Sequence, residues 1–330
     1  MLCGDIHPNP GPRPPRGPMD LTVGFTAQTS LRMTKCVQAF EVWCDEFLMI
    51  SLKQLKSDDR AVAWALRAYG LYCFKEGLPR YLFVYAITGL QELYPEVRPH
   101  LGVAWQIDKK WQVHEPGQCR PVLPGVAIRA ALCIAALWGW KFWLGIVLLG
   151  FSAMLHPSEM MALRRQDLVF PTDLGHDVPS LFIHVRDPKT ARFARRQHGR
   201  VDDAAVIWIV FPIFGALPLQ SKLYPWSISV FRRQWNAVME RLNIPFRQSE
   251  RGVTPGVLRG SGATFLYSSS EDIQWVAWRG RWARLRTLEF YLQEVGAQLL
   301  IHSLDSISKS KIQFLAKASW PVIQTACLTE

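Results

Sequence analysis

The chain has 330 residues, of which 49% are hydrophobic and 20% charged, and this balance excludes a disordered protein. Its length suggests two domains, because domains commonly span about 100–200 residues. The formal net charge of +11 favours an anionic partner, which is nucleic acid, an acidic membrane surface or an acidic protein. The seven cysteines are scattered and form no CxxC pair, so we expect reduced thiols and no zinc site.

Residues 1–20 are rich in proline, and we expect a disordered tail there. Within it, residues 4–12 read GDIHPNPGP and resemble the ribosome-skipping peptides of viral and retroelement polyproteins. Asp5, Ile6 and the NPGP ending match those peptides, whereas His7 stands where they usually carry glutamate. A proline-rich linker is the alternative interpretation. No apolar stretch follows the start, so we expect no secretory signal peptide.

Apolar residues at helical spacing predict a helical first domain over residues 21–119. Ser57 and Asp58 are N-cap candidates for its second helix. A further apolar helix covers residues 78–93, with Pro79 at a first-turn position. One face of the first helix is expected to carry Val37, Phe40, Trp43, Phe47 and Leu48.

Residues 130–155 carry a single charge, Lys141, and are long enough to cross a bilayer. We nevertheless expect two packed core helices, because glycines interrupt the segment and the polar sequence HPSE continues it. The glycines are Gly139, Gly145 and Gly150. A membrane anchor through this segment is the alternative.

A linker with two prolines is expected over residues 119–124, and beyond it the pattern becomes mixed α and β. Residues 181–185, LFIHV, predict a strand. The basic segment 186–201 predicts a β-turn followed by a second strand. Asp202 and Asp203 are cap candidates for the helix after it. A later amphipathic helix is expected to place on one face Ile228, Phe231, Trp235, Val238 and Leu242.

Three pieces far apart in the sequence carry candidate chemistry: PKT with Lys189, VLRGSGATFL with Arg259, and RGRWARLRTLEFY with Trp282 and Tyr291. Arg259 precedes Trp282 by 23 residues, and Trp282 precedes Tyr291 by nine. This order and spacing resemble the catalytic domain of tyrosine recombinases, where an HxLR helix precedes a G-[His/Trp] signature and the nucleophile. The segment LHPSEMMALRRQDL also resembles their GLRxSEL box. The resemblance covers roughly residues 120–300.

The resemblance implies that Tyr291 attacks a DNA phosphodiester and forms a 3′-phosphotyrosine link. It implies that Arg259 clamps the phosphate, because a guanidinium matches phosphate oxygens bidentately. Lys189 becomes the general acid for the leaving oxygen. Trp282 takes the His/Trp position, where its indole N–H donates to a phosphate oxygen. A tyrosine with a pKa near 10 becomes usable when cations stabilise its phenolate, and no metal or other cofactor is required.

Two positions depart from the family pattern. His156 stands where the first box carries an arginine, and Gly256 replaces the histidine of HxLR. A histidine is mostly neutral at pH 7 and cannot form the bidentate fork, so His156 is an imperfect catalytic substitute. Losing one preorganised donor typically costs about 10²–10³ in rate. We therefore expect DNA binding with slow or absent cleavage. Arg164 and Arg165 follow the box and are not expected at the site.

Basic clusters support a DNA partner independently of the resemblance. Residues 186–200 contain six lysines and arginines against one acidic residue, and residues 279–286 contain four arginines and no acidic residue. Such clusters neutralise backbone phosphates and predict salt-dependent binding to double-stranded DNA. A solvated surface with a basic bias is the alternative interpretation.

The resemblance implies a mainly α fold with a small antiparallel β-sheet, an α+β architecture. A helical core-binding domain (21–119) would precede a catalytic domain (120–305) and a C-terminal tail (306–330). Family members act as tetramers on DNA, which predicts a homo-oligomer exchanging a segment within residues 293–330. A nuclear location is expected in a eukaryote and a cytoplasmic one otherwise, with no membrane association.

Three functions are carried forward from the sequence. The first is a site-specific recombinase or integrase of a mobile element, acting in DNA recombination and DNA integration. The second is a non-catalytic DNA-binding relic of such an element. The third is a membrane-anchored protein held by residues 130–155. A type IB topoisomerase shares the chemistry of the first and is not separated from it by these motifs.

Overall fold

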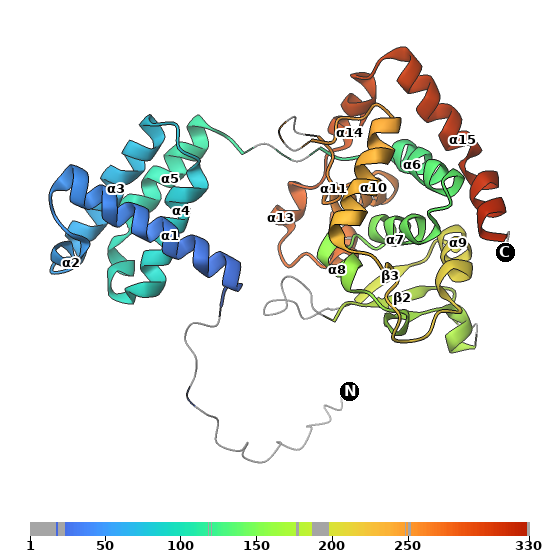
Figure 1. The fold of residues 1–330 in the computed structure, drawn as a ribbon, viewed down its shortest axis with the longest axis horizontal. Coiled ribbons are helices and arrows are strands. Elements are labelled where there is room, and N and C mark those ends of the chain that lie inside the picture. The colour runs from blue at the N-terminus through green and yellow to red at the C-terminus, as the bar shows by residue number, and fades with distance from the viewer. Residues whose placement is uncertain are drawn as a thin grey trace, which may run out of the picture. The chain divides into compact units, whose positions relative to one another are not determined.

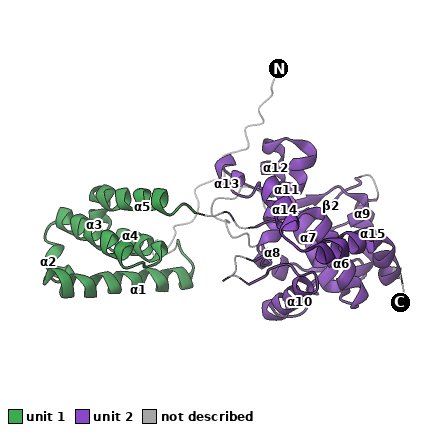
Figure 2. Cartoon of the chain, turned by 90° about the horizontal axis from the view of Figure 1, so that it is seen from above, with its two compact units in different colours: residues 1–118 green, residues 119–330 purple. Residues whose placement is uncertain are grey.

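The computed structural model describes residues 18, 24–117, 119, 121–175, 178–186, 198–247, 249 and 252–328. The chain divides into two compact units, residues 1–118 and 119–330, shown in different colours in Figure 2. Its described residues are mainly helical, with a three-stranded antiparallel sheet in the second unit (Figure 1). The predicted fold class is confirmed.

In unit 1 (residues 1–118), the described residues form a bundle of helices around a buried apolar core that includes Phe40, Leu66 and Phe83. Asp58 caps α3 as predicted, accepting a hydrogen bond of 2.9 Å from the backbone N–H of Arg60. The elements are α1 (Ala27–Trp43), the π-helix η1 (Cys44–Leu48), α2 (Leu52–Leu55), α3 (Asp59–Lys75), α4 (Arg80–Leu93), the 3₁₀-helix η2 (Pro95–His100) and α5 (Gly102–His114).

The predicted apolar face of the first helix is wrong at its end. Val37, Phe40 and Trp43 are buried, but Phe47 is 55% exposed. The helix changes from α to π at Cys44, and this wider turn shifts the later residues off the 3.6-residue period. Pro79 likewise lies one position earlier than predicted, because it is the N-cap of α4 and not a first-turn residue.

In unit 2 (residues 119–330), the three short strands pair in the order β1–β2–β3. Leu181 pairs with Val201, and His184 pairs with His198. The helices before and after the strands are α6 (Gly125–Leu137), α7 (Lys141–Ser152), α8 (Pro157–Ala162), α9 (Ala204–Phe214), α10 (Ile228–Arg241), α11 (Val257–Ser270), α12 (Ile273–Gly280), α13 (Leu285–Glu289), α14 (Glu294–His302) and α15 (Ser306–Leu328). The strands and 3₁₀-helices are η3 (Arg165–Asp167), β1 (Leu168–Val169), η4 (Pro171–Leu174), β2 (Leu181–His184) and β3 (His198–Val201).

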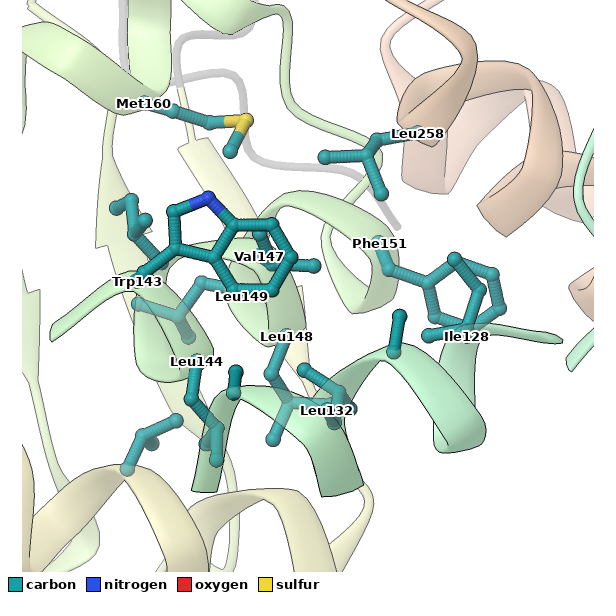
Figure 3. Close-up of a cluster of buried hydrophobic side chains, with 14 of the residues drawn as sticks. Ile128, Leu132, Trp143, Leu144, Val147, Leu148, Leu149, Phe151, Met160 and Leu258 are labelled. Carbon is teal, nitrogen blue, oxygen red and sulfur yellow. The ribbon is translucent and has the colours of Figure 1, made fainter. Parts of the chain in front are cut away.

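Helices α6 and α7 lie at the centre of the core of unit 2. Trp143 is fully buried among the apolar side chains of this core, which include the rings of Phe231 and Trp235, and part of the core is drawn in Figure 3. Gly139 has a φ of +70°, a conformation that glycine adopts without strain, and it turns the chain between the two helices. The prediction of two packed helices over 130–155 is thus confirmed. No helix in the described ranges has the length and apolar character needed to span a bilayer.

The segment predicted as a C-terminal tail, residues 306–330, forms a long helix up to Leu328. This helix, α15, packs extensively against α6 of the same chain. Ile312, Ala316 and Ile323 are buried in the core of unit 2. These apolar residues follow at intervals of four and seven, which places them on one helical face. In this structure the described part of the segment therefore packs into unit 2.

Candidate functional site

Arg259 lies in the first turn of α11, three residues after the N-cap residue Gly256. Its guanidinium connects two distant chain segments. Nη1 donates to the carbonyl of Met154 at 2.8 Å, and Nη2 donates to the carbonyl of Gly280 at 2.6 Å. Its side chain is only 14% exposed. Folding therefore fixes this arginine at the point where the segments after α7 and at the end of α12 meet.

Trp282 and Tyr291 complete a stacked group with Arg259. The guanidinium carbon lies 4.3 Å from the centre of the indole ring, and the Trp282 and Tyr291 ring centres are 5.3 Å apart, with their planes tilted by 58°. The Tyr291 carbonyl accepts a hydrogen bond of 2.9 Å from the Thr264 hydroxyl on α11. Three of the predicted site residues thus meet, although Trp282 and Tyr291 follow Arg259 by 23 and 32 residues along the chain.

Glycine at position 280 permits this stack. A Cβ atom there would lie 1.7 Å from the indole of Trp282, which is closer than any real contact. The chain then turns through Arg281, whose φ of +62° is left-handed, and the Trp282 N–H closes the turn on the Ala277 carbonyl at 2.9 Å. The indole therefore folds back over the end of α12.

His156 is the N-cap residue of α8. Its Nδ1 lies 2.9 Å from the Ser158 hydroxyl, and its backbone N–H donates to the carboxylate of Glu159 at 2.8 Å. The same carboxylate lies 4.0 Å from Nη1 of Arg259. His156 is therefore joined to Arg259 through Glu159. The contact of His156 with this carboxylate is made by its backbone N–H.

Arg281 belongs to the same contact network, although the sequence did not single it out. Its Nη2 donates to Glu159 at 2.8 Å, and the two side chains are only 5% and 4% exposed. In the sequence, Arg281 is one of several arginines in a basic run, and Glu159 is only a match to a family box. The sequence signal that could have identified Arg281 is its position between Gly280 and Trp282, directly beside the predicted aromatic site residue.

Burial is the main reason why the pKa of Arg259 is lowered, to about 10. The neighbouring charge of Arg281 lowers it further, whereas Glu159 and Tyr291 raise it. The guanidinium therefore remains charged at pH 7. Two arginines that repel each other share one carboxylate, and this leaves the buried group with a positive charge.

Lys189 falls outside the described residues, as does most of the basic segment around it. Arg165 donates to the carbonyls of Gly215 and Leu168 and pairs with Asp173, so it serves the packing around the sheet. In the described part of the chain, no group of three or more His, Cys, Asp or Glu side chains is arranged to hold a metal ion.

A small hollow of about 230 Å³ lies between the sheet and α12. Asp202, beside β3, connects the two, because its carboxylate lies 2.8 Å from Nη2 of Arg279 and 2.5 Å from Nε of Arg200. The hollow is lined by Phe182, His198, Arg200, Trp275, Trp278 and Arg279. The ion pairs therefore attach α12, and the site at its end, to the edge of the sheet.

We expect unit 2 to lose stability in acid partly through Asp202. Burial alone would raise the pKa of Asp202, but hydrogen bonds from Ser180 and Arg200 and the charge of Arg279 lower it below its ordinary 3.8. The folded form thus holds this proton less readily than the unfolded chain. The stabilisation is complete above about pH 4 and is lost as the pH falls through the lower folded value.

Thermal unfolding between pH 5 and about pH 2 measures this effect. The Tm of Asp202→Asn should fall less steeply with acid than the Tm of the unaltered chain. Asp203→Asn is the control, because asparagine retains the cap that Asp203 provides to Ala205. Equal acid slopes in the unaltered chain and in Asp202→Asn would contradict the prediction.

No family model and no curated protein matches this sequence. Solved structures with a similar fold include the Tn1549 transposon integrase in complex with transposon right end DNA. It has a TM-score of 0.56 and 12% identity, and the match covers 86% of this chain and 96% of the integrase chain. The XerH site-specific recombinase bound to a palindromic difH substrate, in its post-cleavage complex, has a TM-score of 0.50 and 15% identity. That match covers 84% of this chain and 78% of the recombinase chain. The chain therefore has a tyrosine recombinase-like fold, as predicted.

Proposed function

We propose that this chain is a DNA-binding protein of the tyrosine recombinase type, whose second unit breaks and rejoins DNA strands at Tyr291. The stack of Arg259, Trp282 and Tyr291 is the observation that carries the proposal. It joins a buried cation, an indole and a phenol from separate segments. A phosphodiester transesterification needs such a cation next to its nucleophile.

In the proposed reaction, the Tyr291 hydroxyl gives its proton to solvent and its oxygen attacks the phosphorus. The bond to the 5′-oxygen of the next nucleotide breaks, and a 3′-phosphotyrosine link forms. Arg259 neutralises charge on the non-bridging oxygens. The leaving 5′-oxygen takes up a proton, which we assign to Lys189. Attack of a 5′-hydroxyl on the link reverses these steps and rejoins the strand.

Slow cleavage is part of the proposal. His156 cannot provide the guanidinium fork of the first box. Gly256 provides no side chain at the position of the HxLR histidine. Both Nη atoms of Arg259 already donate to backbone carbonyls, so fewer of its N–H groups are left for a phosphate. These three observations also favour a second candidate, a DNA-binding protein that no longer cleaves.

Double-stranded DNA is the proposed partner of both candidates. Arg284 and Arg286 lie in the sequence between Trp282 and Tyr291 and are exposed, and the run 279–286 contains no acidic residue. Lysines and arginines of this kind bind backbone phosphates with little sequence preference, so binding should weaken as salt rises. A tetramer on DNA, and a nuclear location in a eukaryotic host, follow from this proposal.

A duplex nicked beside the cleavage position tests the chemistry, because the released fragment diffuses away and the covalent product accumulates. The unaltered chain should form a slow adduct that survives denaturation. Tyr291→Phe should abolish this adduct. Tyr267→Phe is the matched control, because Tyr267 packs in the same apolar cluster as Tyr291 and should retain it.

The two candidates differ in this experiment. Salt-sensitive DNA binding without an adduct would establish the non-cleaving candidate and exclude the first one. The double variant with His156→Arg and Gly256→His restores both family side chains. It should raise the rate of adduct formation by about 10²-fold or more if those positions limit cleavage.

A further inference from the structure

One oxygen of Glu159 collects the polar groups around the stack. It accepts from the backbone N–H of His156 at 2.8 Å and from Nη2 of Arg281 at 2.8 Å, and it lies 4.0 Å from Nη1 of Arg259. The guanidinium of Arg281 is thereby held beside the residue where the family's first box carries its arginine. It arrives there from a different segment, the turn after α12.

Arg281 occupies this place against two local preferences. Its left-handed conformation, with a φ of +62°, is uncommon for a residue with a side chain and favours glycine or asparagine. Its side chain is only 5% exposed, and its Nε–H has no hydrogen-bond partner among the described residues. Backbone strain together with a buried, unpartnered donor is typical of a functional position.

The charges in this cluster do not cancel. Arg259 and Arg281 each carry one positive charge, and among the described residues Glu159 is the carboxylate that contacts both. A buried charge without a counter-charge is costly, so the cluster favours an incoming anion. The phosphate of DNA is an anion with several acceptor oxygens, and guanidinium groups bind it well.

We propose that Arg281 supplies the second positive charge of the phosphate site, in place of the arginine that position 156 lacks. Glu159 acts as a positioning residue that orients the Arg281 guanidinium. The phosphate is then bound by an Arg259–Arg281 pair, and Tyr291 attacks it from the other end of the stack. This inference rests on the proposed function and changes its arginine set from one residue to two.

The inference predicts that arginines at positions 281 and 156 can replace each other. Arg281→Gln should slow adduct formation on the nicked duplex by about 10²–10³-fold. Adding His156→Arg to that variant should recover at least about tenfold of the rate, because the new guanidinium lies beside the same Glu159. Arg232→Gln is the control for loss of one positive charge from the same unit, since Arg232 is exposed on α10 and is not one of the residues around Glu159. It should slow the reaction far less.

A second readout separates the inference from the proposed chemistry. Inorganic phosphate should raise the Tm of the unaltered full chain and should raise the Tm of Arg281→Gln less. In the variant that combines Arg281→Gln with His156→Arg, phosphate should raise the Tm by as much as in the unaltered chain. An equal phosphate shift in the unaltered chain and Arg281→Gln would overturn the inference, as would the lack of any shift in the unaltered chain. A normal adduct rate in Arg281→Gln would also overturn it while leaving the role of Tyr291 intact. An unaltered chain without adduct would instead refute cleavage, and the phosphate shifts would still decide the role of Arg281.

Discussion

Replacing Arg259 by alanine is expected to lower the rate of adduct formation by about 10³-fold or more. The guanidinium is the cation of the stack, and it also donates to the carbonyls of Met154 and Gly280. Alanine removes the charge and leaves both carbonyls without that donor. Each hydrogen bond to a charged group contributes about 1.5–3 kcal/mol, so the position of Trp282 should also be less well defined. Single-turnover cleavage of the nicked duplex measures the loss.

Arg259→Lys separates charge from geometry. A lysine retains a positive charge but cannot reach two carbonyls with a planar fork. Its cleavage rate should therefore lie between those of the unaltered chain and Arg259→Ala. Burial lowers the pKa of Arg259 to about 10, which is still high enough for full charge at pH 7. The ratio of the cleavage rates of the unaltered chain and Arg259→Ala should therefore be the same from pH 6 to pH 8. A rate for Arg259→Ala within threefold of the unaltered chain would exclude Arg259 from the reaction.

Gly262→Ala is expected to destabilise unit 2, although alanine is the better helix former. The gain in helix propensity is at most about 1 kcal/mol. A Cβ atom at Gly262 would lie 2.0 Å from the carbonyl oxygen of Phe151 on α7, which is backbone and cannot turn aside. Forcing α11 away from α7 should cost about 3 kcal/mol, so the net loss is about 2 kcal/mol. For a unit of this size, Tm should fall by about 4–8 °C.

Gly102→Ala provides the opposite expectation. This glycine opens α5, and a Cβ atom there would meet nothing within 4 Å. Alanine should therefore leave the Tm of unit 1 unchanged or raise it slightly. Thermal unfolding followed by circular dichroism compares the two variants. A Gly262→Ala chain as stable as the unaltered one would show that α7 and α11 can separate at little cost.

The stack was predictable because a chemical motif fixes its spacing. Arg259, Trp282 and Tyr291 lie at intervals that the family pattern specifies, and the fold brings them together. The pairing of Arg281 with Glu159 was not predictable, since the two residues are 122 positions apart. It also depends on a left-handed turn that no local preference of arginine indicates.

Elements with a strong apolar period were predicted well, and those set by tertiary contacts were not. The two helices over 130–155 and the cap at Asp58 follow from local sequence. The exposure of Phe47 depends on a π-turn with no signal in the apolar pattern. The helix α15 was missed although its buried residues follow a helical period, because their role becomes evident only when they pack against α6.

The packing of α15 on α6 within one chain bears on how copies of this protein would associate. Every copy carries the same helix and the same α6 surface, so an exchange of α15 between copies replaces contacts by identical contacts. The burial of apolar surface is then the same in the exchanged and the unexchanged form and does not favour either. The balance between the two forms depends on the strain in the connection at residues 303–305 and on the protein concentration. An assembly formed in this way is controlled by mass action and by the local concentration that DNA imposes, and not by a specialised interface.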